Sequence, residues 1–168
     1  MEEKLIACSG CGARVRDLPG QPHPYIGAAA GCWEVYGRVL AKEYGEYGYP
    51  EPTHHLTVDT YAVQHPGQPG RRSIQSVNLH LASLYLILEK DWSSPAVSAA
   101  LQKSLKQGGR FTWLEPPMPN GRITVLDVAR APDLAAHQEI VEAWARDVWA
   151  AWSHHHERVN KYVDDFLV

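Results

Sequence analysis

The sequence predicts a mainly α fold: a bundle of four to five helices with a metal-stapled N-terminal loop and a small β hairpin. Three observations lead to this prediction. Apolar residues recur at helical spacing in segments that Pro and Gly separate. The 168 residues, 45% hydrophobic and 21% charged, suit one globular domain with a single core. Three cysteines fall within the first 32 residues, so we divide the domain into a zinc-binding segment, 1–31, and a helical bundle, 32–168.

The first three predicted helices follow this segment in order. One begins at Cys32 and ends near Tyr44, with its valines and leucine at helical spacing. The next begins at Thr53, a residue type that caps helices, and ends before Pro66, although its β-branched residues leave a strand open. The third begins at Ser73, and its leucines point almost all the way round, which predicts a central helix inside the bundle.

A short fourth helix has Pro95 in its first turn, and we expect it to end at Gly108 and Gly109. After this helix, apolar residues no longer recur at helical spacing. Segments 110–114 and 122–128 flank several prolines and an Asn-Gly turn signal, which predicts a small β hairpin or two extended edges.

The last predicted helix is long. Asp133 caps its start, and the pattern continues without a breaker to about Phe166. Within its run of three histidines, His155 falls on the apolar stripe and His154 points away. His155 is therefore expected to face the core.

Charge and composition exclude several classes of function. Lys and Arg number 16 against 19 Asp and Glu, a formal charge of −3, so no basic excess is present to follow a phosphate backbone. The N-terminus is acidic where a signal peptide is basic, and no apolar run reaches the length of a membrane span. We expect a cytoplasmic protein that binds neither nucleic acid nor membrane. A small-molecule or protein partner and a homodimer stay open.

The cysteine pair in CSGCGARV, residues 8–15, can be half of a zinc site, a redox dithiol or a disulfide. A reducing compartment makes a structural disulfide unfavourable. A thioredoxin-like dithiol belongs beside a βαβ pattern, and none follows here. The zinc hypothesis is favoured, with the alternative that the thiols are ordinary surface or buried cysteines.

A tetrahedral zinc site needs four ligands, and the chain has three cysteines. Cys8, Cys11 and Cys32 with His23 form a Cys3His set within 25 residues rich in Gly and Pro. Such a segment lacks a core of its own, so metal binding would stabilise it directly. His65 is an alternative fourth ligand, because the start of one helix lies near the end of its antiparallel neighbour.

A second metal site is predicted inside the bundle. His54, His80 and His155 fall on inward-facing sides of three different helices. Three imidazoles would leave a coordination position open for water or substrate on zinc, nickel, iron or manganese. Asp59 and Asp127 are candidates to orient these rings. Alternatively, each histidine is a core residue whose ring N–H meets a carbonyl.

Five motifs are spread over nearly the whole chain: CSGCGARV, HPYIG with GCW.VYG.VLA.EY, HLTVDTYAVQHPG, SIQSVNLHLASLY and VWAAWSHHHERV. Together they resemble an uncharacterised bacterial family of unknown function. This resemblance carries no assigned activity.

The segment RSIQSVNLHLASLYLILE is also similar to the second helix of the DinB and YfiT-like bundles. In those proteins the histidine of an HLA context binds a divalent metal, and His80 occupies that position. Those proteins usually add two ligands from an HxxxH motif on a later helix. In this sequence the residues four positions before His154, His155 and His156 are Ala150, Ala151 and Trp152, so no HxxxH motif is formed there. The resemblance implies a metal-dependent enzyme, in a superfamily that includes thiol transferases and isomerases.

Two hypotheses from different classes follow. The chain is a metal-dependent enzyme with a separate structural zinc, or it is a non-catalytic, zinc-stabilised module that binds a protein partner. A redox dithiol at Cys8 and Cys11 is the third hypothesis.

Overall fold

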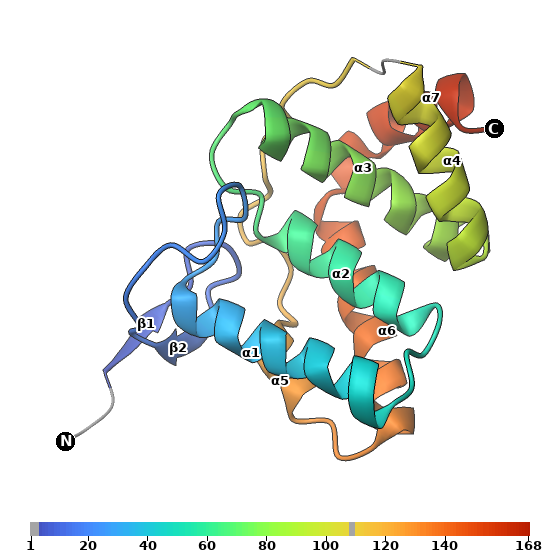
Figure 1. The fold of residues 1–168 in the computed structure, drawn as a ribbon. Coiled ribbons are helices and arrows are strands. Elements are labelled where there is room, and N and C mark those ends of the chain that lie inside the picture. Colours follow the sequence, from blue (N-terminus) through green and yellow to red (C-terminus); the bar gives the residue numbers. More distant parts are fainter. Residues whose placement is uncertain (1–3, 108–109) are drawn as a thin grey trace.

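The computed structural model describes residues 4–107 and 110–168, so the expected helix stop at Gly108 and Gly109 lies outside the described part. The mainly α fold is confirmed, with a small antiparallel hairpin at the N-terminal end of the chain (Figure 1). None of the described helices is long and apolar enough to cross a membrane. The elements are β1 (Leu5–Ala7), β2 (Arg14–Arg16), α1 (Ala30–Ala41), the π-helix η1 (Lys42–Glu46), α2 (Thr53–Gln64), α3 (Arg71–Leu88), α4 (Ser94–Lys106), α5 (Val125–Ala129), α6 (Leu134–Ala151), the 3-10 turn η2 (Ser153–His155) and α7 (His156–Phe166).

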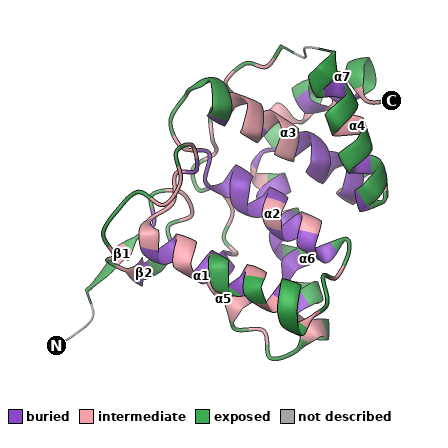
Figure 2. Ribbon diagram, in the orientation of Figure 1, coloured by how far each residue is buried: buried purple, intermediate pink, exposed green. Residues whose placement is uncertain are grey.

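Two helices lie at the centre of the bundle (Figures 1 and 2). Helix α2 packs against both α3 and α6, and α3 packs against α2, α4, α6 and α7, which agrees with the prediction of a central third helix. Nearly every side chain of α2 is buried, polar ones included, whereas α3 keeps an exposed edge. The polar groups of α2 that have hydrogen-bond partners can be buried at little cost, so this helix is buried more completely than its sequence pattern indicates.

The first, second and fourth helix predictions are confirmed, and so is a third helix from Arg71 to Leu88. The first helix continues as a π-helix, which turns Glu43 into the interior. The second segment is helical despite its β-branched residues, because burial of the whole segment overrides a weak local preference.

The long last helix is interrupted, so the prediction of one unbroken helix is wrong. The backbone N–H of Trp152 bonds to both Val148 and Trp149 carbonyls, and a single 3-10 turn follows. Side chains then stabilise the break: His156 Nε2 donates to the Trp149 carbonyl at 2.8 Å, and His155 Nε2 donates to the Glu115 carbonyl at 2.9 Å.

The predicted hairpin over 110–128 is also wrong. Thr124 and Asp127 form a capping box, so the second half of this region folds as α5. The first half runs as an extended segment without a strand partner among the described residues. Asn120 anchors it: its amide donates to the Val63 carbonyl, and its oxygen accepts from Trp152 Nε1, both at 2.9 Å.

The hairpin that does form joins β1 and β2 around the cysteine pair. Leu5 pairs with Arg16 and Ala7 with Arg14 in antiparallel register. The connecting loop, residues 8–13, closes with a bond from Cys8 N–H to the Ala13 carbonyl at 2.9 Å. The hairpin thus presents both thiols of the pair at its tip.

Candidate metal centre

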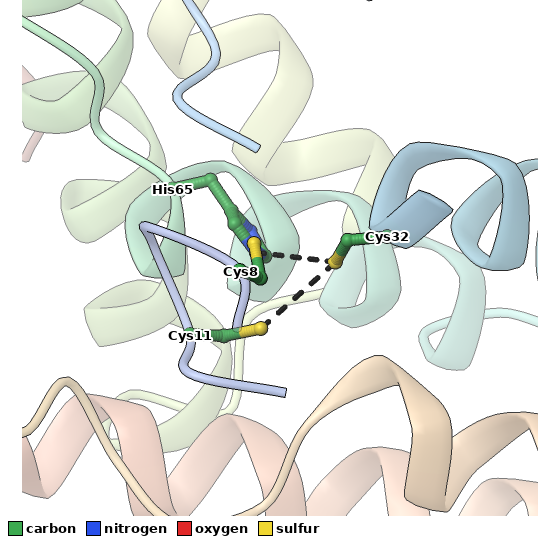
Figure 3. Close-up of side chains that lie close together, drawn as sticks. All are labelled: Cys8, Cys11, Cys32 and His65. Carbon is green, nitrogen blue, oxygen red and sulfur yellow. Dashed lines mark hydrogen bonds between the residues drawn. The ribbon is translucent and has the colours of Figure 1, made fainter. Parts of the chain in front are cut away.

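Three separate segments bring four metal-ligating side chains together. Cys8 and Cys11 come from the tip of the hairpin, Cys32 from the first turn of α1, and His65 from the residue that follows α2 (Figure 3). Their ligand atoms all lie within 4.8 Å of one another. Among the residues that the structure describes, no other group of three or more metal-ligating residues is this compact.

The spacing of the donor atoms suits a tetrahedral metal. Cys11 Sγ lies 3.9 Å from Cys32 Sγ, and Cys32 Sγ lies 3.5 Å from His65 Nε2. Around an ion with metal–sulfur and metal–nitrogen distances of about 2.3 and 2.1 Å, tetrahedral geometry separates the ligand atoms by about 3.5 to 3.8 Å. The three cysteines are free thiols, not disulfide-bonded.

The imidazole of His65 is oriented for ligation. Its Nδ1 donates to the Tyr61 carbonyl at 2.7 Å, which places the ring proton on Nδ1 and leaves the Nε2 lone pair facing the sulfurs. Metal-bound histidines commonly have their second nitrogen held in this way. This bond arises within the helix, because Tyr61 precedes His65 by one turn.

The sulfurs also receive hydrogen bonds of the kind that stabilises thiolates. The Ala29 backbone N–H donates to Cys8 Sγ at 3.4 Å, and the Tyr61 hydroxyl donates to Cys32 Sγ at 3.5 Å. Cys8, Cys32 and His65 are buried, while Cys11 is partly exposed. The ligand set is therefore closed to solvent on all sides except that of Cys11.

The thiols and the imidazole of the cluster shift one another's proton affinity. Hydrogen bonds from Cys11 and Cys32 lower the pKa of Cys8, and hydrogen bonding to Cys11 and Cys8 raises the pKa of Cys32. Burial lowers the pKa of His65, but bonding to Cys11 and Cys8 outweighs burial and raises it to about 9. Sulfurs this close together favour a cation among them.

Close packing fixes the position of the hairpin tip against His65. A Cβ on Gly10 would lie 2.4 Å from His65 Cδ2 and 2.9 Å from the Gly27 carbonyl oxygen. The Gly27 N–H in turn donates to the His65 carbonyl at 3.0 Å. Glycine at position 10 therefore lets the cysteine pair approach the imidazole.

The fourth member of the cluster is His65 and not His23. His23 lies in the loop before α1, where its ring contacts Tyr25 and Trp33 at centroid distances of 4.4 and 5.3 Å. The preference for His23 is corrected for a structural reason. Nearness in sequence placed it among the cysteines, but packing of α2 beside α1 brings His65 there instead.

The predicted second site is not assembled, because His54, His80 and His155 do not meet. Each bonds to a different acceptor: His54 to Glu43 and His80 to Asp59, both at 2.7 Å, and His155 to the Glu115 carbonyl. The alternative, in which each ring N–H meets a carbonyl, holds for His155 alone.

Glu43 is the centre of the first of these arrangements and was missed by the sequence analysis. Its carboxylate is fully buried and accepts from His54 Nδ1, His137 Nε2 and the Thr57 hydroxyl at 2.6 to 2.7 Å. His137 comes from near the start of α6. Helical periodicity could not find this cluster, since the π-helix changes the direction of Glu43.

Asp59 is the centre of the second arrangement. It is buried, its Oδ1 accepts from His80 Nδ1, and its Oδ2 accepts from the Ser83 hydroxyl. The expectation that Asp59 orients an imidazole is met at His80. Asp127, the other candidate, instead accepts from the Thr124 N–H at 2.8 Å in the cap of α5.

Comparisons with known proteins show the family of the chain. No curated protein and no solved structure matches it. A family described as a family of unknown function, DUF5946, matches residues 6–153, a span that includes all four members of the Cys3His cluster. The chain therefore belongs to the DUF5946 family of unknown function.

Proposed function

We propose that the protein is a cytoplasmic, zinc-stabilised helical protein that holds one structural Zn²⁺ on Cys8, Cys11, Cys32 and His65. The observation that carries this proposal is the convergence of four donor atoms within 4.8 Å from three separate segments. Three thiolates and one imidazole form a closed ligand set typical of structural zinc, whereas catalytic zinc keeps a position open. Thiolate ligands also favour zinc over magnesium or calcium.

The ion would join the N-terminal segment to the bundle. Residues 17–29 contain no helix or strand, and the hairpin before them has only three residues in each strand. Such a segment buries little apolar surface by itself. Binding free energy at the ligands would therefore become folding free energy for the hairpin, the start of α1 and the end of α2.

A metal-dependent enzyme is the less supported of the two functional hypotheses. A metal at His80, which the DinB and YfiT-like resemblance implies, needs further ligands close by. The predicted partners, His54 and His155, are bonded elsewhere. The zinc-stabilised module is the better supported of the two.

A specific surface favours the interaction module as a second candidate. A cleft of about 850 Å³ adjoins the metal centre between the hairpin tip, residues 66–69 and residues 113–120. Met118 in its wall is 95% exposed, although methionine is normally buried. A protein partner that covers this side chain would explain its exposure.

Elemental analysis of the untagged, purified protein tests the zinc proposal. We expect one zinc ion per chain, lost in Cys32→Ser and His65→Gln. His23→Gln and His80→Gln are matched controls and should retain the ion, because neither imidazole lies in the cluster. Zinc that survives in His65→Gln but disappears in His23→Gln would overturn the ligand assignment.

Alkylation under native conditions separates zinc from the redox dithiol. Bound thiolates should react slowly until the metal is chelated. Rapid labelling of both Cys8 and Cys11 in the purified, metal-analysed protein would exclude the structural ion. Two ions per chain, one of them lost in His80→Gln, would instead support the metal-dependent enzyme.

A further inference from the structure

A second cleft, distinct from the metal centre, lies along α3. It encloses about 360 Å³ and is lined by Tyr25, Arg72, Gln75, Ser76, Leu79 and His80. Arg72, Ser76 and His80 are four residues apart, so they lie in one row on the same face of the helix. Tyr25 comes from the loop that the Gly27 N–H ties to the His65 carbonyl.

His80 is held in one orientation at the end of this row. Its Nδ1 donates to Asp59 at 2.7 Å, and the Asp59 carboxylate is only 2% exposed. Ser83 donates to the other carboxylate oxygen, and His55 Nε2 lies 3.6 Å from that oxygen. Since Nδ1 carries the proton, Nε2 is the ring nitrogen available for another partner.

The His80 side chain belongs to the cleft. The His80 side chain is 29% exposed and forms part of the cleft wall. In the described part of the chain, no residue is hydrogen-bonded to Nε2. A buried carboxylate behind a partly exposed imidazole whose other nitrogen has no protein partner is the arrangement that general bases use.

The same cleft carries a positive charge at its other end. Arg72 is exposed and takes part in none of the ion pairs found among the described residues. The described residues that line the cleft include no carboxylate. A guanidinium in this position can bind a carboxylate or phosphate through paired hydrogen bonds.

We propose that this cleft binds a small anionic molecule through Arg72 and that His80 Nε2 accepts a proton from a hydroxyl group of that molecule. The proton passes to Nε2, and the electron pair of the broken O–H bond stays on the oxygen. The charge of the resulting imidazolium is balanced by Asp59. This activity is separate from the structural zinc and needs no metal or electron acceptor.

Inorganic phosphate is a minimal probe, because it carries both negative charge and a hydroxyl. Two-dimensional NMR of the imidazole nitrogens of the zinc-loaded protein should show a saturable shift of His80 Nε2 with phosphate but not with chloride at equal ionic strength. Arg72→Gln should weaken this binding about tenfold, the effect expected for one charge-assisted contact. Arg71→Gln is the control, since Arg71 is exposed but does not line the cleft.

Chemical reactivity provides a second readout. Diethylpyrocarbonate should acylate His80 in the free protein, and phosphate should protect it. Asp59→Asn should slow acylation and shift the ring protonation seen by NMR, because an amide holds Nδ1–H less strongly.

Two results would overturn the proposal. One is a phosphate response of equal strength in wild type and Arg72→Gln. The other is acylation of His80 that phosphate leaves unchanged, which would indicate a pair that only stabilises the fold.

Discussion

The Cys3His cluster and the Glu43 cluster differ in how their buried polar side chains find complementary partners. Both are buried groups of polar side chains that come from distant segments and include histidine. In the Glu43 cluster the histidines donate directly to a carboxylate, so donors and acceptors complement one another. In the Cys3His cluster, sulfurs and an imidazole lone pair face one another, and such a set is complemented by a cation.

The comparison shows what distinguishes a metal site from a polar core among residues of the same type. A histidine on an inward-facing stripe pairs with the nearest acceptor, and a buried carboxylate supplies one at both His54 and His80. No carboxylate belongs to the Cys3His group. Histidine inside a helical bundle therefore indicates a metal only where other ligands, rather than acceptors, surround it.

The largest expected effect comes from removal of the metal. A strong zinc chelator should lower the melting temperature of the wild type by about 10 °C or more, because loss of a structural metal is among the most destabilising changes. Calorimetry with and without chelator measures it. The Glu43→Gln variant should show the same drop, since its altered cluster holds no ion. If the chelator leaves the wild-type melting temperature unchanged, the Cys3His cluster holds no stabilising ion, and the contrast with the Glu43 cluster is contradicted.

Glu43→Gln itself should cost about 3 kcal/mol, because one of two buried histidines loses its acceptor. Denaturant unfolding measures the change, and the zinc content should stay at the wild-type value. Glu46→Gln is the matched control, since Glu46 lies exposed on the same π-helix and should change stability by less than about 0.5 kcal/mol. Equal effects of both substitutions would show that Glu43 is not the centre of a cluster.

Replacing each of two glycines by alanine should change the stability of the protein in opposite directions. Gly10→Ala should destabilise the protein by about 1 to 3 kcal/mol and weaken zinc retention, because its Cβ would overlap His65. Gly37→Ala should stabilise it by about 0.5 to 1 kcal/mol, since Gly37 is an exposed position in α1 with nothing within 4 Å of a Cβ. Thermal unfolding of both variants in parallel tests the packing at the hairpin tip.

The smallest effect concerns pH at His155, which contacts a carbonyl rather than a carboxylate. Burial lowers the pKa of His155 below 6.5, so the folded state favours the neutral ring. Its contribution to stability is complete above pH 6.5 and decreases as the pH falls below that value. The loss of stability between pH 7 and pH 5 should therefore be smaller in His155→Gln than in wild type. A larger loss in the variant would contradict the sign of this shift.

The sequence predicted the elements better than their arrangement. Pro66 lies just beyond the end of α2, and Pro95 lies in the first turn of α4, because proline geometry acts between neighbours. Thr53 marks the start of α2 but is its first helical residue and not its cap. The prediction of a hairpin over 110–128 failed because Thr124 and Asp127 form a capping box that begins a helix. The turn signal at Asn120 had favoured two strands instead. The break at Trp152 depends on two bonds to a distant segment: Trp152 Nε1 donates to Asn120 Oδ1, and His155 Nε2 donates to the Glu115 carbonyl.

By itself the sequence determined the mainly α fold and three of the four candidate ligands, because helical spacing and a Cys-x-x-Cys pair are local patterns. The tertiary structure alone decided between His23 and His65 and gave His54, His80 and His155 three different partners. The physical reason is that the packing of helices determines which distant side chains meet. A buried polar group then pairs with the nearest complementary group, and periodicity along a single helix does not encode that choice.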